Sequence, residues 1–88
     1  MENGIHLCIV TQDKTAFERD VSYVNIPAAF GSLGILRGHA PMVCAVSRGI
    51  VRCTFDGDGA ARIEVGSGVA EISDNELTIL VADAKIAE

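Results

Sequence analysis

The stretch that decides the fold is GIVRCTFDGDGAARIEV, residues 49–65. Apolar and polar side chains alternate over residues 51–55, with the period of two expected of a strand that has one buried face. Residues 56–59 read Asp-Gly-Asp-Gly, the clearest turn signal in the chain, and residues 62–65 alternate again. The two runs are therefore predicted to pair as an antiparallel hairpin.

The same pattern extends to both sides of this hairpin. Asp74-Asn75 is a second turn signal, between apolar runs at 69–72 and 77–81. Further short segments rich in β-branched residues lie at 5–11, 16–18, 21–27 and 42–46. Pro27 is expected to end its segment, because proline cannot donate to a strand ladder. No helical period separates the segments, and only residues 83–88 could begin a helix, so the pattern indicates a single antiparallel all-β sandwich or barrel.

Composition limits the function classes. The chain has 88 residues, 49% of them hydrophobic and 22% charged, which is typical of one compact domain. A net charge of −5 provides no basic face for nucleic acid. No apolar segment approaches the roughly 20 residues of a membrane span, and the start of the chain lacks the cations of a secretory signal. We therefore expect no direct bilayer insertion, and a membrane link only through a partner.

The three cysteines, Cys8, Cys44 and Cys53, are widely spaced and odd in number, and no two form a Cys-x-x-Cys pair. Zinc is therefore not expected at these positions. Each cysteine lies in an apolar run, so we interpret them as reduced core thiols of a cytosolic protein, without a disulfide.

Residues 34–41, GILRGHAP, form a glycine- and proline-punctuated loop that is expected to be rigid. His39 in this loop invites a catalytic or metal-binding interpretation, but no orienting carboxylate or further ligand lies near it in sequence. A hydrogen bond to the backbone of its own loop, or a place at a partner interface, explains it better. A stand-alone small sandwich that binds a ligand or metal through His39 remains the alternative hypothesis. No cofactor is expected.

Two other motifs carry weaker signals for chemistry. Asp56 and Asp58 resemble half of a calcium loop, but the glutamate at its twelfth position and the flanking helices are missing, so solvated turn carboxylates are expected. Ser67 lacks the frame of a nucleophile elbow, and a bulge or tight bend explains its glycine neighbours. A hydrolase that uses Ser67 or Cys53 has no base near either residue in sequence.

Residues 28–36 are nearly uncharged, although they should form a connection between strands. Connections normally face water. This stretch therefore either packs back onto the sandwich or forms an exposed apolar patch of the kind that marks a docking surface.

Residues 33–41, LGILRGHAP, resemble the signature loop of the epsilon subunit family of F-type ATP synthases. Weaker matches to the family follow one another with near-constant spacing, and together they cover essentially the whole chain. These are residues 5–17, 48–52, 66–71 and 75–80.

The resemblance implies a fold and a function. Residues 1–83 would form the family's flattened antiparallel β-sandwich, and residues 84–88 a short tail where the C-terminal helical hairpin of longer members begins. The chain would be a non-catalytic rotor subunit of the central stalk, docking the gamma subunit onto the c-ring and coupling ion transport to ATP synthesis. It would be a peripheral subunit at the cytoplasmic face of a bacterial inner membrane.

The resemblance also implies contacts by position. The residues expected to face the gamma subunit are Thr11, Leu36, His39, Ala40, Pro41 and Cys44, and those expected to face the c-ring are Phe30, Gly31 and Ser32. Many members have an acidic residue where this chain has Ser32, so ring docking would depend on shape and apolar contact. Because the chain ends before the family's C-terminal helices, which restrain ATP hydrolysis and in some members bind ATP, we expect those two functions to be absent.

Overall fold

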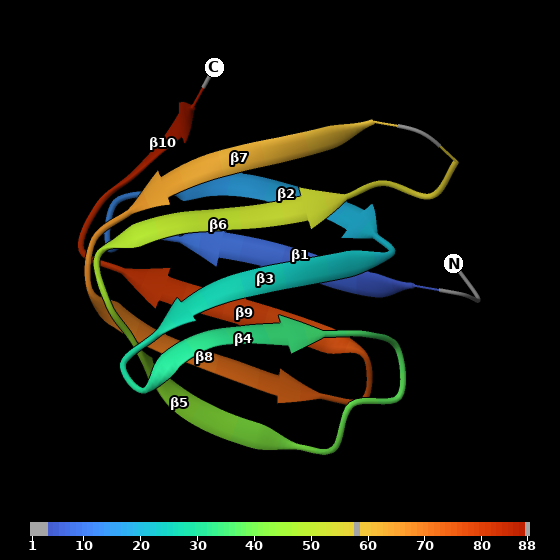
Figure 1. The fold of residues 1–88 in the computed structure, drawn as a ribbon. Helices are drawn as coiled ribbons and strands as arrows, with labels where there is room; N and C mark the ends of the chain where they lie inside the picture. Colours follow the sequence, from blue (N-terminus) through green and yellow to red (C-terminus); the bar gives the residue numbers. More distant parts are fainter. Residues whose placement is uncertain (1–3, 58, 88) are drawn as a thin grey trace.

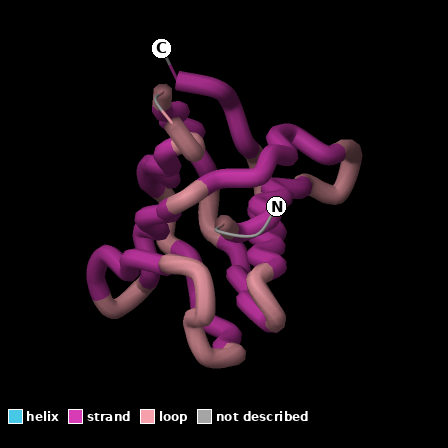
Figure 2. Tube along the Cα trace, turned by 90° about the vertical axis from the view of Figure 1, so that its right-hand side faces the viewer, coloured by secondary structure: helices cyan, strands magenta, loops and turns pink. Residues whose placement is uncertain are grey.

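The computed structural model describes residues 4–57 and 59–87, which contain ten strands joined by turns (Figure 1). The strands are β1 (Ile5–Val10), β2 (Thr15–Val21), β3 (Tyr23–Ala28), β4 (Gly31–Ile35), β5 (Met42–Val46), β6 (Gly49–Thr54), β7 (Ala60–Val65), β8 (Gly68–Ser73), β9 (Glu76–Val81) and β10 (Ala84–Ala87). Within the described residues the trace consists of strands and loops alone (Figure 2). The predicted all-β sandwich is confirmed.

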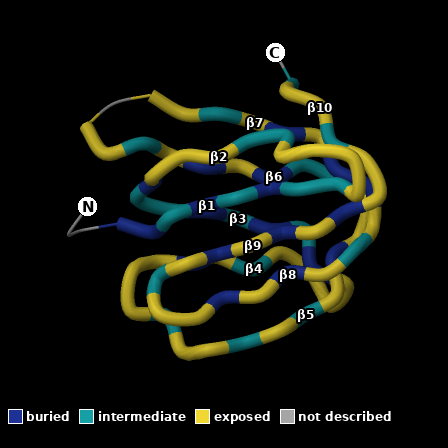
Figure 3. Tube along the Cα trace, turned by 180° about the vertical axis from the view of Figure 1, so that it is seen from behind, coloured by how far each residue is buried: buried dark blue, intermediate teal, exposed yellow. Residues whose placement is uncertain are grey.

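The strands form one continuous sheet that folds into two layers. The β3 sheet has the order β4-β3-β6-β7-β10, and the β8 sheet has the order β5-β8-β9-β1-β2. The two sheets join at one corner, where Ala28 of β3 pairs with Val46 of β5. Figures 1 and 3 view the sandwich from opposite sides.

Both predicted hairpins are present. Val51 of β6 lies opposite Ile63 of β7, and both side chains are buried. Between β8 and β9, Asp74 and Asn75 have φ angles of 53° and 62°, the left-handed backbone that a two-residue type I′ turn requires. Asn and Asp tolerate this conformation better than other non-glycine residues, which is why the sequence signal was informative.

One pairing departs from the antiparallel expectation. β1 and β9 are parallel, whereas the other pairs among the described strands are antiparallel. Leu7 aligns with Leu77 and Ile9 with Ile79, and all four side chains are fully buried. Burial of matching apolar faces, rather than a local turn, therefore sets this pairing.

The described tail is a strand, not the short helical start that the sequence allowed. Residues 84–87 form β10, antiparallel to β7, instead of a helical start. An isolated helical turn fixes several residues for one hydrogen bond, whereas the open edge of β7 offers a full ladder of partners. Residue 88 lies outside the described residues.

The expected strand end at Pro27 is wrong, because β3 continues to Ala28. The carbonyl of Pro27 accepts a hydrogen bond from the amide of Ser47 at 2.7 Å. The nitrogen of Pro27 faces the same side, between the last pairing with β6 at Asn25 and the first pairing with β5 at Ala28. Neither the ladder with β6 nor that with β5 needs an amide donor at position 27, so proline is tolerated there.

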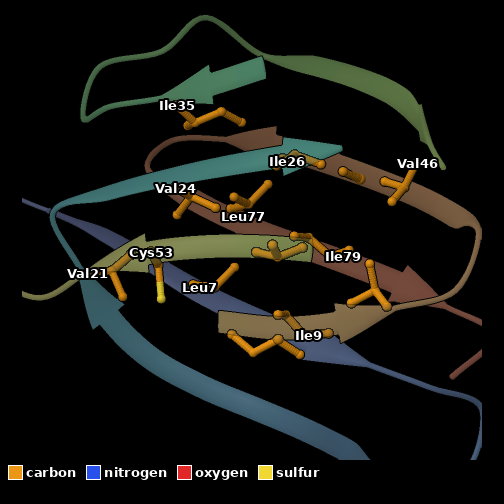
Figure 4. Close-up of a cluster of buried hydrophobic side chains, with 14 of the residues drawn as sticks. Leu7, Ile9, Val21, Val24, Ile26, Ile35, Val46, Cys53, Leu77 and Ile79 are labelled. Carbon is orange, nitrogen blue, oxygen red and sulfur yellow. The ribbon is translucent and has the colours of Figure 1, made fainter. Parts of the chain in front are cut away.

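The core lies between the two sheets and is apolar (Figure 4). It is built from the inward positions of both sheets, such as Leu7, Ile9, Val24, Ile26, Val51, Ile63, Leu77 and Ile79. No polar or charged side chain is buried among the described residues. The fold thus follows directly from the period-two pattern of the strands.

Candidate interaction surface

The loop between β4 and β5 is held in a defined shape. The Gly38 amide donates a hydrogen bond to the side-chain oxygen of Asn75 at 2.7 Å, and the His39 amide donates to the Leu36 carbonyl at 3.2 Å. Gly38 has a φ of 86°, which favours glycine. Leu36 is 59% exposed at the start of the loop. The predicted rigid loop therefore presents an apolar side chain to solvent.

His39 bonds to the backbone of its own loop, as predicted. Its Nδ1 lies 2.7 Å from the carbonyl oxygen of Ala40, so the tautomer protonated at Nδ1 can donate this bond. Among the described residues, no group of three or more His, Cys, Asp or Glu side chains is arranged to hold a metal ion.

The β3–β4 hairpin tip carries Phe30, Gly31 and Ser32. Phe30 is 70% exposed, Ser32 is also exposed, and Gly31 has a φ of 130°. By contrast, Ile35 is fully buried and Leu33 packs against the core. Both alternatives for the uncharged stretch 28–36 therefore apply: Leu33 and Ile35 pack on the sandwich, whereas Phe30 and Leu36 are exposed.

The tip and the loop lie at opposite ends of the sandwich. The loop is bonded to Asn75, whose carbonyl accepts from the amide of His6 near the start of β1. At the tip, the Ala29 amide donates to the carbonyl of Ala45 in β5. Successive cross-strand pairs run from Ala45 through β8 and β9 to Val10, the last residue of β1, so the tip lies at the opposite end of β1 from His6.

The six residues expected to face the gamma subunit do not form one cluster. Leu36, His39, Ala40 and Pro41 share the β4–β5 loop, but Thr11 follows the far end of β1 and belongs to the β1–β2 turn. There the hydroxyl of Thr11 accepts a hydrogen bond from the Asp13 amide at 3.3 Å. Cys44 lies on the inward side of β5 and packs against the core.

An apolar row crosses the outer face of the β8 sheet. Ala45, Val69, Leu80 and Val10 lie side by side on β5, β8, β9 and β1. Val69 is 42% and Leu80 49% exposed, because both occupy outward positions in the regular alternation of buried and exposed residues along β8 and β9 (Figure 3). Outward positions of a sheet that faces water are normally polar, so this apolar row is a candidate docking surface.

Sequence reasoning missed this row, although a signal was present. Leu80 lies between Ile79 and Val81, so β9 ends with apolar residues on both faces. In β5 the outward positions are Val43 and Ala45, on either side of Cys44. Apolar residues on both faces of these strand ends indicate a covering partner, although the register is needed to show that the residues form one row.

The β4–β5 loop borders the outer face of the β8 sheet, where Val43 is the next outward residue of β5 before Ala45 of the apolar row. A hollow of about 350 Å³ is lined by Pro41, Val43 and Glu71, together with neighbouring residues of β5 and β8. Val43, at its edge, is 64% exposed. The surface therefore continues from the loop onto the sheet.

The charged side chains of this face lie between the apolar row and the end of the sheet that holds the β4–β5 loop. They are Glu18, Asp20, Glu71 and Glu76, with His6 among them. Both ring nitrogens of His6 lie 2.7 Å from carboxylate oxygens, Nδ1 from Asp20 and Nε2 from Glu18. The hydrogen bond with Asp20 is the largest cause that raises the pKa of His6 above 6.5.

The thiols are not set up for chemistry. Burial raises the pKa of each thiol above 9.0. Cys53 is the most deeply buried of the three, and Cys8 and Cys44 are less buried. Protonated thiols are poor nucleophiles and metal ligands. All three cysteines are free.

The remaining motifs occupy bends. Ser67 is exposed between β7 and β8, and its carbonyl accepts from the Ala82 amide at 3.1 Å, so it lies in a tight bend. Of the proposed half calcium loop, Asp56 is exposed and Asp58 lies outside the described residues. No helix in the described part of the chain is long and apolar enough to cross a membrane.

Comparison with known proteins gives a consistent result. The model of the ATP synthase delta/epsilon chain beta-sandwich domain matches residues 4–87. The chain is 41% identical over 84 residues to the chloroplastic ATP synthase epsilon chain of Guillardia theta, covering 96% of this chain and 63% of that protein. It is 38% identical over 88 residues to the ATP synthase epsilon chain of Nitratidesulfovibrio vulgaris, covering all of this chain and 65% of that protein.

Solved structures share the fold. A chain of the Euglena gracilis mitochondrial ATP synthase structure, which comprises OSCP, F1 and c-ring, superposes with a TM-score of 0.89 at 23% identity, over 98% of this chain and 55% of that one. A chain of the Tetrahymena thermophila central stalk and c-ring structure gives a TM-score of 0.75 at 17% identity, over 93% and 66%. The resemblance found in the sequence is confirmed, and the chain belongs to the beta-sandwich family of ATP synthase delta and epsilon chains.

Proposed function

We propose that this chain is a non-catalytic rotor subunit that docks the gamma subunit of a rotary ATP synthase onto the c-ring and couples ion translocation to ATP synthesis. It would act as a peripheral subunit at the cytoplasmic face of a bacterial inner membrane. The observation that carries the proposal is the apolar row on the outer face of the β8 sheet. Family membership supports the assignment, because the relatives are ATP synthase epsilon chains.

The gamma subunit would cover the apolar row and the β4–β5 loop together. Leu36, Val43 and Leu80 are each about half exposed or more, and a few such side chains usually dominate an interface. Burying one of them fully contributes roughly 1.5–3 kcal/mol relative to exposure. In this arrangement Thr11 and Cys44 act at the margin of the interface or beneath it, and Val69 and Leu80 form its centre.

The c-ring would meet the β3–β4 tip. β4 has five residues, so the tip and the β4–β5 loop are roughly 15 Å apart at about 3.3 Å per residue. The apolar core is continuous between these two contacts. Because close-packed interiors deform little under load, such a sandwich can transmit torque from the c-ring to the gamma subunit. Phe30 would be the main ring contact, because Ser32 offers no charge.

Binding of the purified gamma subunit tests the stalk-facing surface. The substitutions Leu80→Glu and Leu36→Glu should each weaken binding by about tenfold or more, because a carboxylate cannot be desolvated against an apolar partner. Ala60→Glu, an exposed change on the β3 sheet, is the matched control and should bind as the unchanged chain does. All three variants should retain their unfolding midpoints. Unchanged gamma binding by Leu80→Glu would contradict the assignment of the apolar row.

A further inference from the structure

The outer face of the β3 sheet carries two arginines directly opposite each other. Arg52 of β6 pairs in register with Arg62 of β7, and both side chains are exposed. The same row continues through Asn25 of β3 to Gly34 of β4. This arginine row, defined as Asn25, Arg52 and Arg62, lies on the side of the sandwich opposite the apolar row.

Two like charges in directly opposed positions of an antiparallel pair are destabilising. Neither guanidinium forms a salt bridge within the described residues. The acidic residue Glu64 of β7 lies in the next outward row, opposite Lys85 of β10. Glu64 therefore has a lysine as its cross-strand neighbour. Arg52 and Arg62, in contrast, have no acidic residue directly opposite them in the described strands.

Polar groups of β3 extend the arginine row. The side-chain amide of Asn25 donates to the hydroxyl of Tyr23 at 3.4 Å. The Tyr23 ring covers Gly34, where an added Cβ would lie 2.7 Å from the hydroxyl oxygen. A small residue at 34 thus lets Tyr23 lie against β4, which places its hydroxyl beside the Asn25 amide at the β4 end of the arginine row.

We propose that the arginine row docks an acidic segment of a protein partner. Guanidinium groups bind carboxylates through paired, charge-assisted hydrogen bonds, so a segment with aspartate or glutamate side chains satisfies both arginines and removes their repulsion. Charge complementarity selects this occupant: the opposite face carries Glu18, Asp20, Glu71 and Glu76, so an acidic segment is repelled there and attracted here. The proposal concerns a second surface and does not depend on stalk docking.

Fluorescence anisotropy with a labelled poly-glutamate peptide at low ionic strength tests the proposal. The unchanged chain should bind the peptide, and the double variant Arg52→Gln/Arg62→Gln should bind it about tenfold more weakly or worse. The double variant Lys14→Gln/Arg37→Gln removes the same charge from two exposed positions elsewhere and should retain binding. Equal losses in the two double variants, or no binding by the unchanged chain, would overturn the proposal.

Thermal unfolding of the same proteins provides an independent measurement. The peptide should raise the melting temperature of the unchanged chain and not that of Arg52→Gln/Arg62→Gln, because only a ligand of the folded state stabilises it. Without peptide, Arg52→Gln/Arg62→Gln should melt no lower than the unchanged chain, since the repulsion is gone. Vesicles of phosphatidylglycerol serve as the competing anionic surface. Binding to vesicles without binding to the peptide would overturn the assignment of a protein partner.

Discussion

Asn75 has two tasks that a single residue type can combine. Its backbone adopts the left-handed conformation of the β8–β9 turn, and its side-chain oxygen accepts the hydrogen bond that holds the β4–β5 loop. Glycine would perform the first task but not the second, and alanine neither. The turn residue therefore also determines the shape of the proposed gamma-binding loop.

Asn75→Gly and Asn75→Ala separate these two tasks. Asn75→Gly should keep the hairpin and leave the unfolding midpoint close to that of the unchanged chain, but the Gly38 amide should exchange its hydrogen faster. Asn75→Ala should also lower the stability by about 1 kcal/mol, because alanine is strained at positive φ. Urea unfolding and amide hydrogen exchange measure the two effects. Equal stabilities of the two variants would argue against backbone strain at this position.

His6 connects β1 to the edge strand β2 by charge. Its two ring nitrogens can donate to Asp20 and Glu18 together only when the ring is protonated. The other charged groups around it are Glu76, which pairs with it on β9, and Arg37 and Asp74, which line a second hollow together with His6. The hydrogen bond with His6 is the largest cause that lowers the pKa of Asp20 below 3.8.

The pH dependence of stability follows from these two shifts. Because the pKa of His6 is raised, its contribution is fully present below 6.5 and is lost as pH rises through the higher pKa of the folded state. Because the pKa of Asp20 is lowered, its contribution is present above 3.8 and is lost as pH falls through the folded value. The urea midpoint should therefore decrease as pH rises above 6.5, and His6→Gln should lack that component. Parallel profiles for the two proteins would rule out His6 as the source.

At the scale of elements, the sequence predicts what local chemistry controls. The β6–β7 and β8–β9 hairpins follow from turn residues between alternating runs, and both are found. β10 could not be predicted, because residues 84–87 have no strand pattern of their own and pair only where β7 leaves an open edge. The pairing of β1 with β9 likewise depends on burial of distant residues, which no local turn encodes.

The interaction surface was predictable only in part, for a related reason. The β4–β5 loop is marked by its own glycines and proline, so Leu36 and His39 were identified from sequence. The apolar row depends on the register of four strands, and no single segment shows that Val69 and Leu80 are neighbours. Leu80 can be recognised as an outward apolar residue of β9 only after it is known which face of β9 packs on the core.

Gly68, at the start of β8, is required by the close approach of β9. A Cβ at this position would collide with the carbonyl oxygen of Leu80 and lie 2.8 Å from the Cα of Val81. Both obstacles are backbone, so neither can rotate away. The bend between β7 and β8 therefore depends on glycine for space.

Gly68→Ala should destabilise the fold by about 2 kcal/mol or more, because β8 and β9 must separate. Gly34→Ala is the matched comparison: its obstacle is the Tyr23 side chain, which can move, so the cost should be smaller. Urea unfolding of both variants measures the difference. A cost for Gly68→Ala no greater than that for Gly34→Ala would contradict the close approach of the two strands.

At the scale of the whole molecule, one side of the sandwich is closed by a contact between the sheets. Arg19 of edge strand β2 lies over the ring of Phe55, which follows β6, with its guanidinium carbon 3.5 Å from the ring centroid. Arg19 is at an inward position of β2, opposite Leu7. At the β2 edge of the core, the Arg19 side chain thus covers Phe55 at a position where an apolar side chain would be expected.

A double-mutant cycle measures this contact. Arg19→Gln and Phe55→Leu should each destabilise the protein, and the two together should cost less than the sum of the single changes. The expected coupling is about 0.5–1 kcal/mol, typical of a cation–π pair near the surface. Additive effects would show that the sheets are held at this edge by packing alone.

The parallel alignment of the first strand with the ninth has a consequence for biosynthesis. β1 leaves the ribosome about 70 residues before its partner β9, which spans Glu76–Val81. Until that point the nascent chain cannot close its sandwich, and Leu7 and Ile9 remain without Leu77 and Ile79. Acquisition of structure should therefore be nearly all-or-none once Val81 has left the ribosome, and until then the early strands depend on protection from aggregation.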